Sequence, residues 1–147
     1  MANLRPTIFP YSLIGWREEL CLPELAPGLL LAKIDTGARS AALHAEDIKM
    51  TGNQVSFNLE IAGKRRKIET KLAGTKRVKS SNGYSELRPI IETIVELGAH
   101  RFEVEITLTD RADMGVPMLL GRGSIKGRFV VHPSRSFILS RKKKARP

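Results

Sequence analysis

The 147-residue sequence has one cysteine, few aromatic residues and no long hydrophobic run. Disulfide frameworks and cysteine-rich zinc modules need several cysteines, so Cys21 alone excludes both and favours a cytoplasmic location. Aromatic residues make up 5% of the chain, which argues against a platform for stacking nucleic-acid bases. The apolar stretch 7–16 is broken by Pro10, lacks a charged front, and falls short of the roughly 20 residues of a membrane helix. We therefore expect neither a signal peptide nor a membrane partner.

Positive charge is abundant but unevenly placed. The 25 Lys and Arg residues outnumber the 15 Asp and Glu residues by 10. Residues 64–79 hold eight basic residues against one acid, and residues 141–147 hold five basic residues. We interpret the first segment as solvated surface and the second as a basic, disordered tail, in preference to nucleic-acid binding. Binding of nucleic acid by 64–79 is the third functional hypothesis, and it predicts an affinity that falls steeply with salt.

Apolar residues recur mostly at every second position, which is typical of half-buried strands. The pattern predicts strands over 29–34, 55–61, 91–97 and 102–108, with a short hairpin link at 98–101. A last pair of strands, 129–131 and 137–139, is expected to flank a turn at 132–134.

Helical periodicity is weak, with one or two turns expected near 40–47 and near 122–126. The prediction is a mainly β domain whose short strands close into a barrel, with one or two short helices. This domain would cover residues 15–140, after an N-terminal arm (1–14) and before the tail (141–147).

The strongest local signal is Ile34-Asp35-Thr36-Gly37-Ala38, at the end of a predicted strand. A carboxylate placed there, before a glycine that lets the chain turn, is held rigidly while staying accessible. An aspartate that caps an ordinary turn would show the same pattern. A second element lies far downstream, Met118-Leu119-Leu120-Gly121-Arg122.

Asp-Thr-Gly-Ala after an apolar strand, followed downstream by Leu-Leu-Gly-Arg, resembles the retroviral-type aspartic proteases. The segments 32–45, 79–83, 88–93, 108–111, 117–122 and 127–131 look more closely like those of a bacterial retropepsin-like family that carries the label "ATP-dependent zinc protease". This resemblance covers roughly 15–139 and implies a closed acid-protease barrel with aspartic peptidase activity. Relatives of that family are associated with glutamate ligases, so the resemblance also implies a functional link to such ligases.

Aspartic proteases need two carboxylates that share one proton. This chain contains a single Asp-Thr-Gly, and Asp47, Asp110 and Asp113 lack that context. A complete pair therefore requires a second copy, whose Asp35 meets the first across a two-fold axis. The resemblance implies that Asp35 is catalytic, that Thr36, Gly37 and Ala38 support its loop, that Leu119 lines the cleft, and that Leu120, Gly121 and Arg122 form the wall behind it.

Two cations are expected in the substrate cleft. Lys33 lies two residues before Asp35, so both side chains point to the same face of the strand. With the nearby Arg39, it suggests a preference for acidic or glutamylated peptides. The alternative is that Lys33 pairs with an acid such as Glu46. Retroviral enzymes have an Asp where this chain has Arg39, so their ion pair to the arginine at position 122 is not expected to form here.

Ser81, Asn82 and Gly83 lie between the two motifs and are the best candidates for the tip of a mobile hairpin that covers substrate. The alternative is an ordinary surface turn.

The zinc and ATP of the family label find no support in the residues. His44, His100 and His132 are far apart, and the sequence contains neither His-Glu-x-x-His nor a phosphate-binding Gly-x-x-x-x-Gly-Lys loop. We therefore expect no metal and no cofactor. The leading hypothesis is a homodimeric aspartic endopeptidase. The alternative is a non-catalytic barrel of the same fold that binds peptides or acidic polymers.

Overall fold

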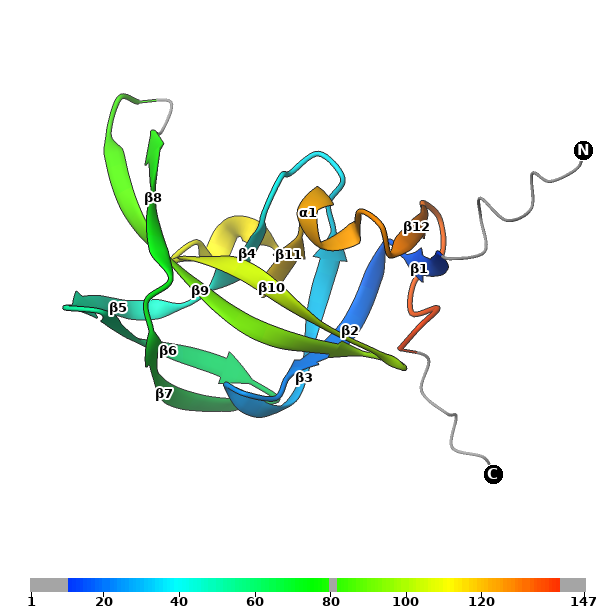
Figure 1. The fold of residues 1–147 in the computed structure, drawn as a ribbon, viewed down its shortest axis with the longest axis horizontal. Coiled ribbons are helices and arrows are strands. Elements are labelled where there is room, and N and C mark those ends of the chain that lie inside the picture. Colours follow the sequence, from blue (N-terminus) through cyan, green and yellow to red (C-terminus); the bar gives the residue numbers. More distant parts are fainter. Residues whose placement is uncertain (1–10, 80–81, 141–147) are drawn as a thin grey trace, which may run out of the picture.

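The computed structural model describes residues 11–79 and 82–140, and six of their strands close into a mixed barrel (Figure 1). The strand order is β10-β4-β11-β3-β2-β9, and the pairing of β9 with β10 closes the ring. The bounds are β2 (Arg17–Leu22), β3 (Ala26–Ile34), β4 (Ala41–His44), β9 (Ser85–Leu97), β10 (His100–Thr109) and β11 (Met118–Leu120). The predicted closed β-barrel is confirmed.

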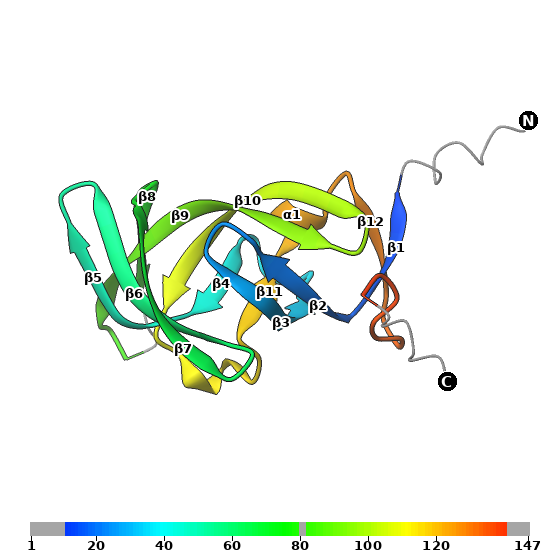
Figure 2. The same cartoon turned by 90° about the horizontal axis from the view of Figure 1, so that it is seen from below.

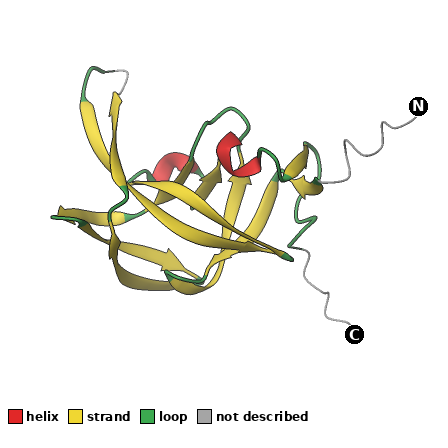
Figure 3. Cartoon of the chain, viewed as in Figure 1, coloured by secondary structure: helices red, strands yellow, loops and turns green. Residues whose placement is uncertain are grey.

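Further strands extend this barrel. β8 (Gly74–Lys79) pairs with β9, while β5 (Glu46–Thr51), β6 (Gln54–Ile61) and β7 (Lys64–Lys71) form a three-stranded sheet at one end of the molecule (Figure 2). At the other end, β1 (Ser12–Gly15) pairs in parallel with β12 (Phe129–His132). Figure 3 shows two short helical segments in the described chain, the 3₁₀ turn η2 (Ala112–Met114) and the helix α1 (Arg122–Ile125).

The core follows the predicted alternation. On β6, the apolar residues at 55, 57, 59 and 61 are all buried, and the same holds for 102, 104, 106 and 108 on β10. β9 and β10 form the expected hairpin, in which Leu97 lies opposite His100. Gly98 in this turn has a positive φ, and a Cβ there would lie 2.8 Å from the Leu139 carbonyl oxygen. Glycine therefore meets both a backbone and a packing requirement at that position.

The helical turns expected near 40–47 are wrong, because this segment forms β4 and the start of β5. β4 lies between β10 and β11 and bonds to both, so Ala41 and Leu43 are buried at alternate positions. Pairing on both edges outweighs a weak helical pattern in so short a segment. The second expected helix is confirmed as α1.

The expected final strand pair is half right. Residues 129–132 form β12, but 137–139 form no strand. The backbone nitrogens of Ile138 and Leu139 instead donate to the carboxylate of Glu18, at 3.0 and 3.1 Å. A side chain from β2 has thus taken the place of a partner strand.

Glu18 is fully buried, and five groups donate hydrogen bonds to it. They are the backbone nitrogens of Gly15, Ile138, Leu139 and Ser140 and the Ser140 hydroxyl. Burial raises the pKa of Glu18, but the hydrogen bonds from Ser140, Gly15 and Leu139 outweigh it, so the pKa is lowered overall. The charged carboxylate therefore fixes the last described segment against β2.

Candidate active site

Asp35 directly follows β3 and is held by its backbone. Its nitrogen donates a 2.8 Å hydrogen bond to the Leu120 carbonyl oxygen. Its half-buried carboxylate accepts a 3.0 Å bond from the Gly37 nitrogen. Because β3 and β11 are parallel neighbours, with Leu120 beside Ile34, the two sequence motifs come together at one point of the barrel.

The loop after Asp35 is fixed by residues that follow β11. The Arg122 nitrogen donates to the Ala38 oxygen at 2.8 Å, and its guanidinium donates to the Thr36 oxygen at 3.0 Å. A Cβ on Gly121 would lie 2.5 Å from the Ser40 carbonyl oxygen, so no larger residue fits without moving the loop. The positions expected to support and back the catalytic loop therefore do contact it.

Lys33, Arg39 and Arg122 are exposed, and they lie in the two chain segments that meet at Asp35. In the described part of the chain, no ion pair includes any of the three. Glu46, the alternative partner considered for Lys33, pairs with Arg65 at 2.5 Å instead. These cations are therefore exposed to solvent in the segments that meet at Asp35.

The β8–β9 hairpin rises from the barrel on the same side as the 35–40 loop (Figure 1). Asn82 and Gly83 lie at its tip, and Gly83 has a φ of 92°. Ser81 lies outside the described residues. A cavity of about 700 Å³, here called the hairpin cavity, is lined by Val78, Lys79, Tyr84, Glu86, Arg88, Arg111 and Asp113. The hairpin therefore forms part of the wall of this cavity, whose lining includes no residue of the 35–40 loop.

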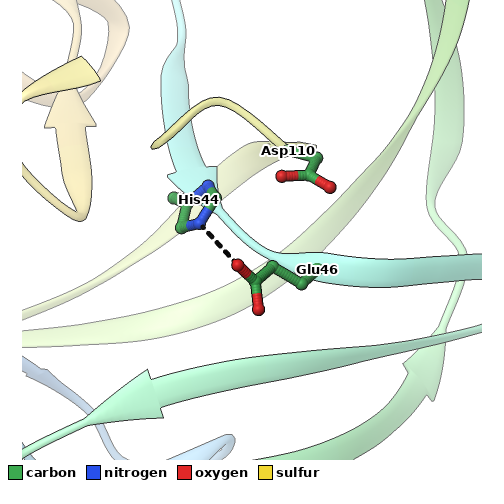
Figure 4. A group of neighbouring side chains, drawn as sticks. All are labelled: His44, Glu46 and Asp110. Atoms are coloured by element: carbon green, nitrogen blue, oxygen red, sulfur yellow. Dashed lines mark ion pairs between the residues drawn. The ribbon is translucent and has the colours of Figure 1, made fainter. Parts of the chain in front are cut away.

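A second polar cluster joins His44, Glu46 and Asp110 (Figure 4). His44 and Glu46 are close in sequence but form too short a motif to specify a metal site, and the sequence analysis missed Asp110 as their neighbour. One ligand-type atom from each lies within 4.8 Å of the others. Parallel pairing of β4 with β10 sets Thr109 beside His44 and so brings Asp110 close. Only the pairing of these distant strands reveals the cluster, since His44 and Asp110 share no local motif.

The hydrogen bonds of His44 do not suit a metal ion. Its Nδ1 accepts a 3.0 Å bond from the Arg111 backbone nitrogen, so the neutral ring carries its proton on Nε2. That Nε2 faces Glu46 at 3.6 Å, and a metal would need its lone pair. Glu46 is already occupied by Arg65, whose hydrogen bond and charge lower the pKa of Glu46. The cluster therefore serves to hold the segment after β10, and the zinc of the family label finds no fitting site in it.

Residues 13–142 match the model of a family described as "RimB-like: Retropepsin-like aspartic endopeptidase RimB". The chain belongs to the RimB-like family. A crystal structure of the protein Lpg0085 from Legionella pneumophila, described as having unknown function, shares the fold with a TM-score of 0.73 and 28% identity. The similarity covers 87% of this chain and 98% of that one. Membership of the RimB-like family confirms the retropepsin-like interpretation.

Curated relatives are longer proteins. Two named "Probable alpha-L-glutamate ligase", from Shewanella pealeana and Shewanella halifaxensis, are each 39% identical over 88% and 86% of this chain. One of the same name from Desulfotalea psychrophila is 31% identical over 84%. The chain spans 28–30% of the length of these relatives. Within residues 11–79 and 82–140, no helix is long and apolar enough to cross a membrane.

Proposed function

We propose that this RimB-like chain is an aspartic endopeptidase that acts as a homodimer in the cytoplasm, with one Asp35 from each copy. The observation that carries this proposal is the setting of Asp35, held by Leu120 and Gly37 yet accessible at the end of β3. In the described chain, no second carboxylate is hydrogen-bonded to Asp35. A working pair therefore needs a second copy.

In the proposed mechanism, the two Asp35 carboxyls share one proton, since two like charges that close do not both ionise. The ionised carboxylate takes a proton from water, and that water attacks the scissile carbonyl carbon. The protonated carboxyl donates a hydrogen bond to the carbonyl oxygen. Collapse of the tetrahedral intermediate breaks the C–N bond as a proton passes to the leaving amine.

We propose that the substrate is an acidic or glutamylated peptide. Lys33 and Arg39 are exposed beside Asp35 and have no ion-pair partner among the described residues. Either cation would offset a substrate carboxylate next to the scissile bond. The names of the relatives add support, because a glutamate ligase makes peptides of this kind.

The cleft of the proposed enzyme lies between the catalytic loop and the β8–β9 hairpin. Leu119 lines it next to Lys33, its register partner on β3, and Leu120 and Gly121 stand behind the loop. Asn82 and Gly83 would cover the substrate and exclude water during the reaction. We propose domain limits of 15–140, which would include all of these parts in one unit.

The test is cleavage of fluorogenic Glu-rich peptides by wild type and Asp35→Asn across the acid pH range. The amide keeps an oxygen to accept the bond from Gly37, so the fold should persist, as circular dichroism can verify. We expect a bell-shaped pH profile for wild type and a loss of about a thousandfold or more in kcat for the variant. Equal cleavage by both would contradict the proposal, and peptide binding without cleavage by either would favour the non-catalytic barrel.

A further inference from the structure

Each copy presents an unbalanced set of charges around Asp35. Arg39 and Arg122 are both exposed, and no ion pair in the described chain includes either of them. Arg122 is held next to Asp35, because its guanidinium donates to the Thr36 oxygen at 3.0 Å. Lys33, two residues before Asp35, adds a third exposed cation.

The backbone of this loop has little freedom to carry Arg39 away. The Gly123 nitrogen donates to the Arg39 oxygen at 3.0 Å, and the Arg122 nitrogen donates to the Ala38 oxygen at 2.8 Å. A Cβ at Gly121 would lie 2.8 Å from the Arg39 carbonyl carbon, so the two segments are in close contact. The backbone of Ala38 and Arg39 is therefore fixed against the segment that carries Arg122, so the two exposed arginines extend from adjoining segments.

Two-fold symmetry makes this excess of positive charge oppose dimerisation. Any group close to the axis lies close to its own copy. If Asp35 meets its copy at the axis, the Arg122 guanidinium on the Thr36 oxygen and the loop that carries Arg39 come close to the axis too. Three cations in each of two copies give six positive charges, against the one negative charge of a pair that shares a proton. At low ionic strength this repulsion opposes pairing.

We propose that Arg39 and Arg122 of the two copies form an anion-binding site at the centre of the dimer, and that a carboxylate-rich peptide must occupy it for stable pairing. This inference rests on the proposed dimeric peptidase and adds the way in which it is regulated. Binding of the acidic substrate therefore stabilises the dimer that cleaves it. Free chains stay apart, which keeps the peptidase inactive until such a peptide is present.

The surroundings favour a peptide over a nucleic acid as the occupant. The hairpin cavity offers few unpaired cations, because Arg88 pairs with Glu86 at 2.7 Å and Arg111 pairs with Asp113 at 3.4 Å. A phosphate backbone needs an extended run of unpaired cations to neutralise it. A peptide needs only a few carboxylates on flexible side chains to reach the guanidinium groups of Arg39 and Arg122.

The experiment is sedimentation of the full chain at neutral pH, at about 0.05 M and about 0.5 M salt, with and without short oligo-L-glutamate. Oligo-L-glutamine and a single-stranded oligonucleotide of equal charge are the comparison ligands. Arg39→Asp removes the central repulsion at an exposed position. Lys49→Asp makes the same change in net charge on β5, in the distant three-stranded sheet, and is the control.

We expect the wild-type dimer dissociation constant to fall about tenfold or more with high salt or with oligo-L-glutamate. Arg39→Asp should dimerise at low salt without peptide, while Lys49→Asp should behave as wild type. The inference would be overturned if the wild-type dissociation constant did not change with salt or peptide. It would also be overturned if Arg39→Asp were as monomeric as wild type at low salt. Equal assembly by the oligonucleotide would overturn the choice of carboxylates.

Sedimentation reads association without cleavage, so the two proposals fail separately. Asp35-dependent cleavage by a dimer that forms without anions would leave the proposed function standing and remove this inference. An anion-dependent dimer that never cleaves peptides would remove the proposed function instead.

Discussion

The backbone nitrogen of Asp35 donates a 2.8 Å hydrogen bond to the carbonyl oxygen of Leu120, which joins the end of β3 to the end of β11. The residue after Leu120 is Gly121, which lies against the carbonyl groups of the 38–40 loop. The position of the candidate catalytic carboxylate is therefore set by a strand far away in the sequence.

Gly121→Ala tests this contact. Its new Cβ would lie 2.5 Å from the Ser40 oxygen, so the loop must shift, and we expect a loss of about 1–3 kcal/mol in unfolding free energy. Peptidase kcat should fall by about a hundredfold, because misplacement by about 1 Å is that costly. Gly74→Ala, with nothing within 4 Å of its Cβ, is the control and should change neither quantity appreciably. Thermal unfolding and kinetics measure both, and equal behaviour of the two variants would refute the contact's role.

Glu18→Gln tests the buried carboxylate. The amide cannot accept all five donors, so we expect about 3 kcal/mol of destabilisation at neutral pH. The pKa of Glu18 is lowered from its ordinary value of 4.5, so its stabilising effect is present above that pH and is lost as pH falls through the folded-state pKa. The gap in unfolding free energy between wild type and variant should therefore shrink below about pH 4.5.

Glu19→Gln is the matched control for that experiment, since Glu19 is the next residue on β2 and is only half-buried. We expect a change below about 0.5 kcal/mol for it. Urea unfolding at several pH values measures both variants. If the difference in unfolding free energy between wild type and Glu18→Gln stayed constant with pH, the carboxylate charge would not be the source of the stabilisation.

Lys33→Leu tests the cleft assignment. If Lys33 meets a substrate carboxylate, kcat/KM for a Glu-containing peptide should fall about tenfold or more relative to a Leu-containing one. Lys49→Leu, at another exposed position, on β5, should leave the ratio unaltered. Competitive cleavage of the two peptides gives the ratio directly, and an unchanged preference in Lys33→Leu would remove Lys33 from the cleft.

Chelation tests the assignment of the His44 cluster. Because the His44 Nδ1 accepts from Arg111 and Glu46 pairs with Arg65, removal of divalent metals should leave peptidase activity and melting temperature unchanged. Added zinc should not raise either. A loss of activity with chelator that zinc restores would show that the ring turns over to bind metal.

Alternation predicted the longer strands β3, β6, β9 and β10, because burial on one face imposes a pattern that survives without knowledge of partners. Val104 and Ile106 on β10 are examples, and both are buried. The shorter barrel strands β2, β4 and β11 were not predicted as strands. The segment 40–47 was misjudged because its conformation depends on β10 and β11, which pair with β4 from far away in the sequence.

Polar groups were harder to predict than strands. Glu18 and Glu19 look alike in sequence, and only the docking of 138–140 makes the first a buried acceptor. The motif around Asp35 was recognisable because a tight strand-to-turn junction needs specific residues. The excess of positive charge near Asp35 could be recognised only from the structure, in which the Arg122 guanidinium donates to the Thr36 oxygen.

The central claim is that two Asp35 residues from two copies act together, and mixing wild type with Asp35→Asn tests it most directly. Equal amounts at fixed total concentration, with acidic peptide present and time for subunit exchange, place two intact carboxyls in about one quarter of the dimers. The account predicts that activity falls to about one quarter of the unmixed wild-type value. A fall to about one half, as independent subunits would give, would contradict it.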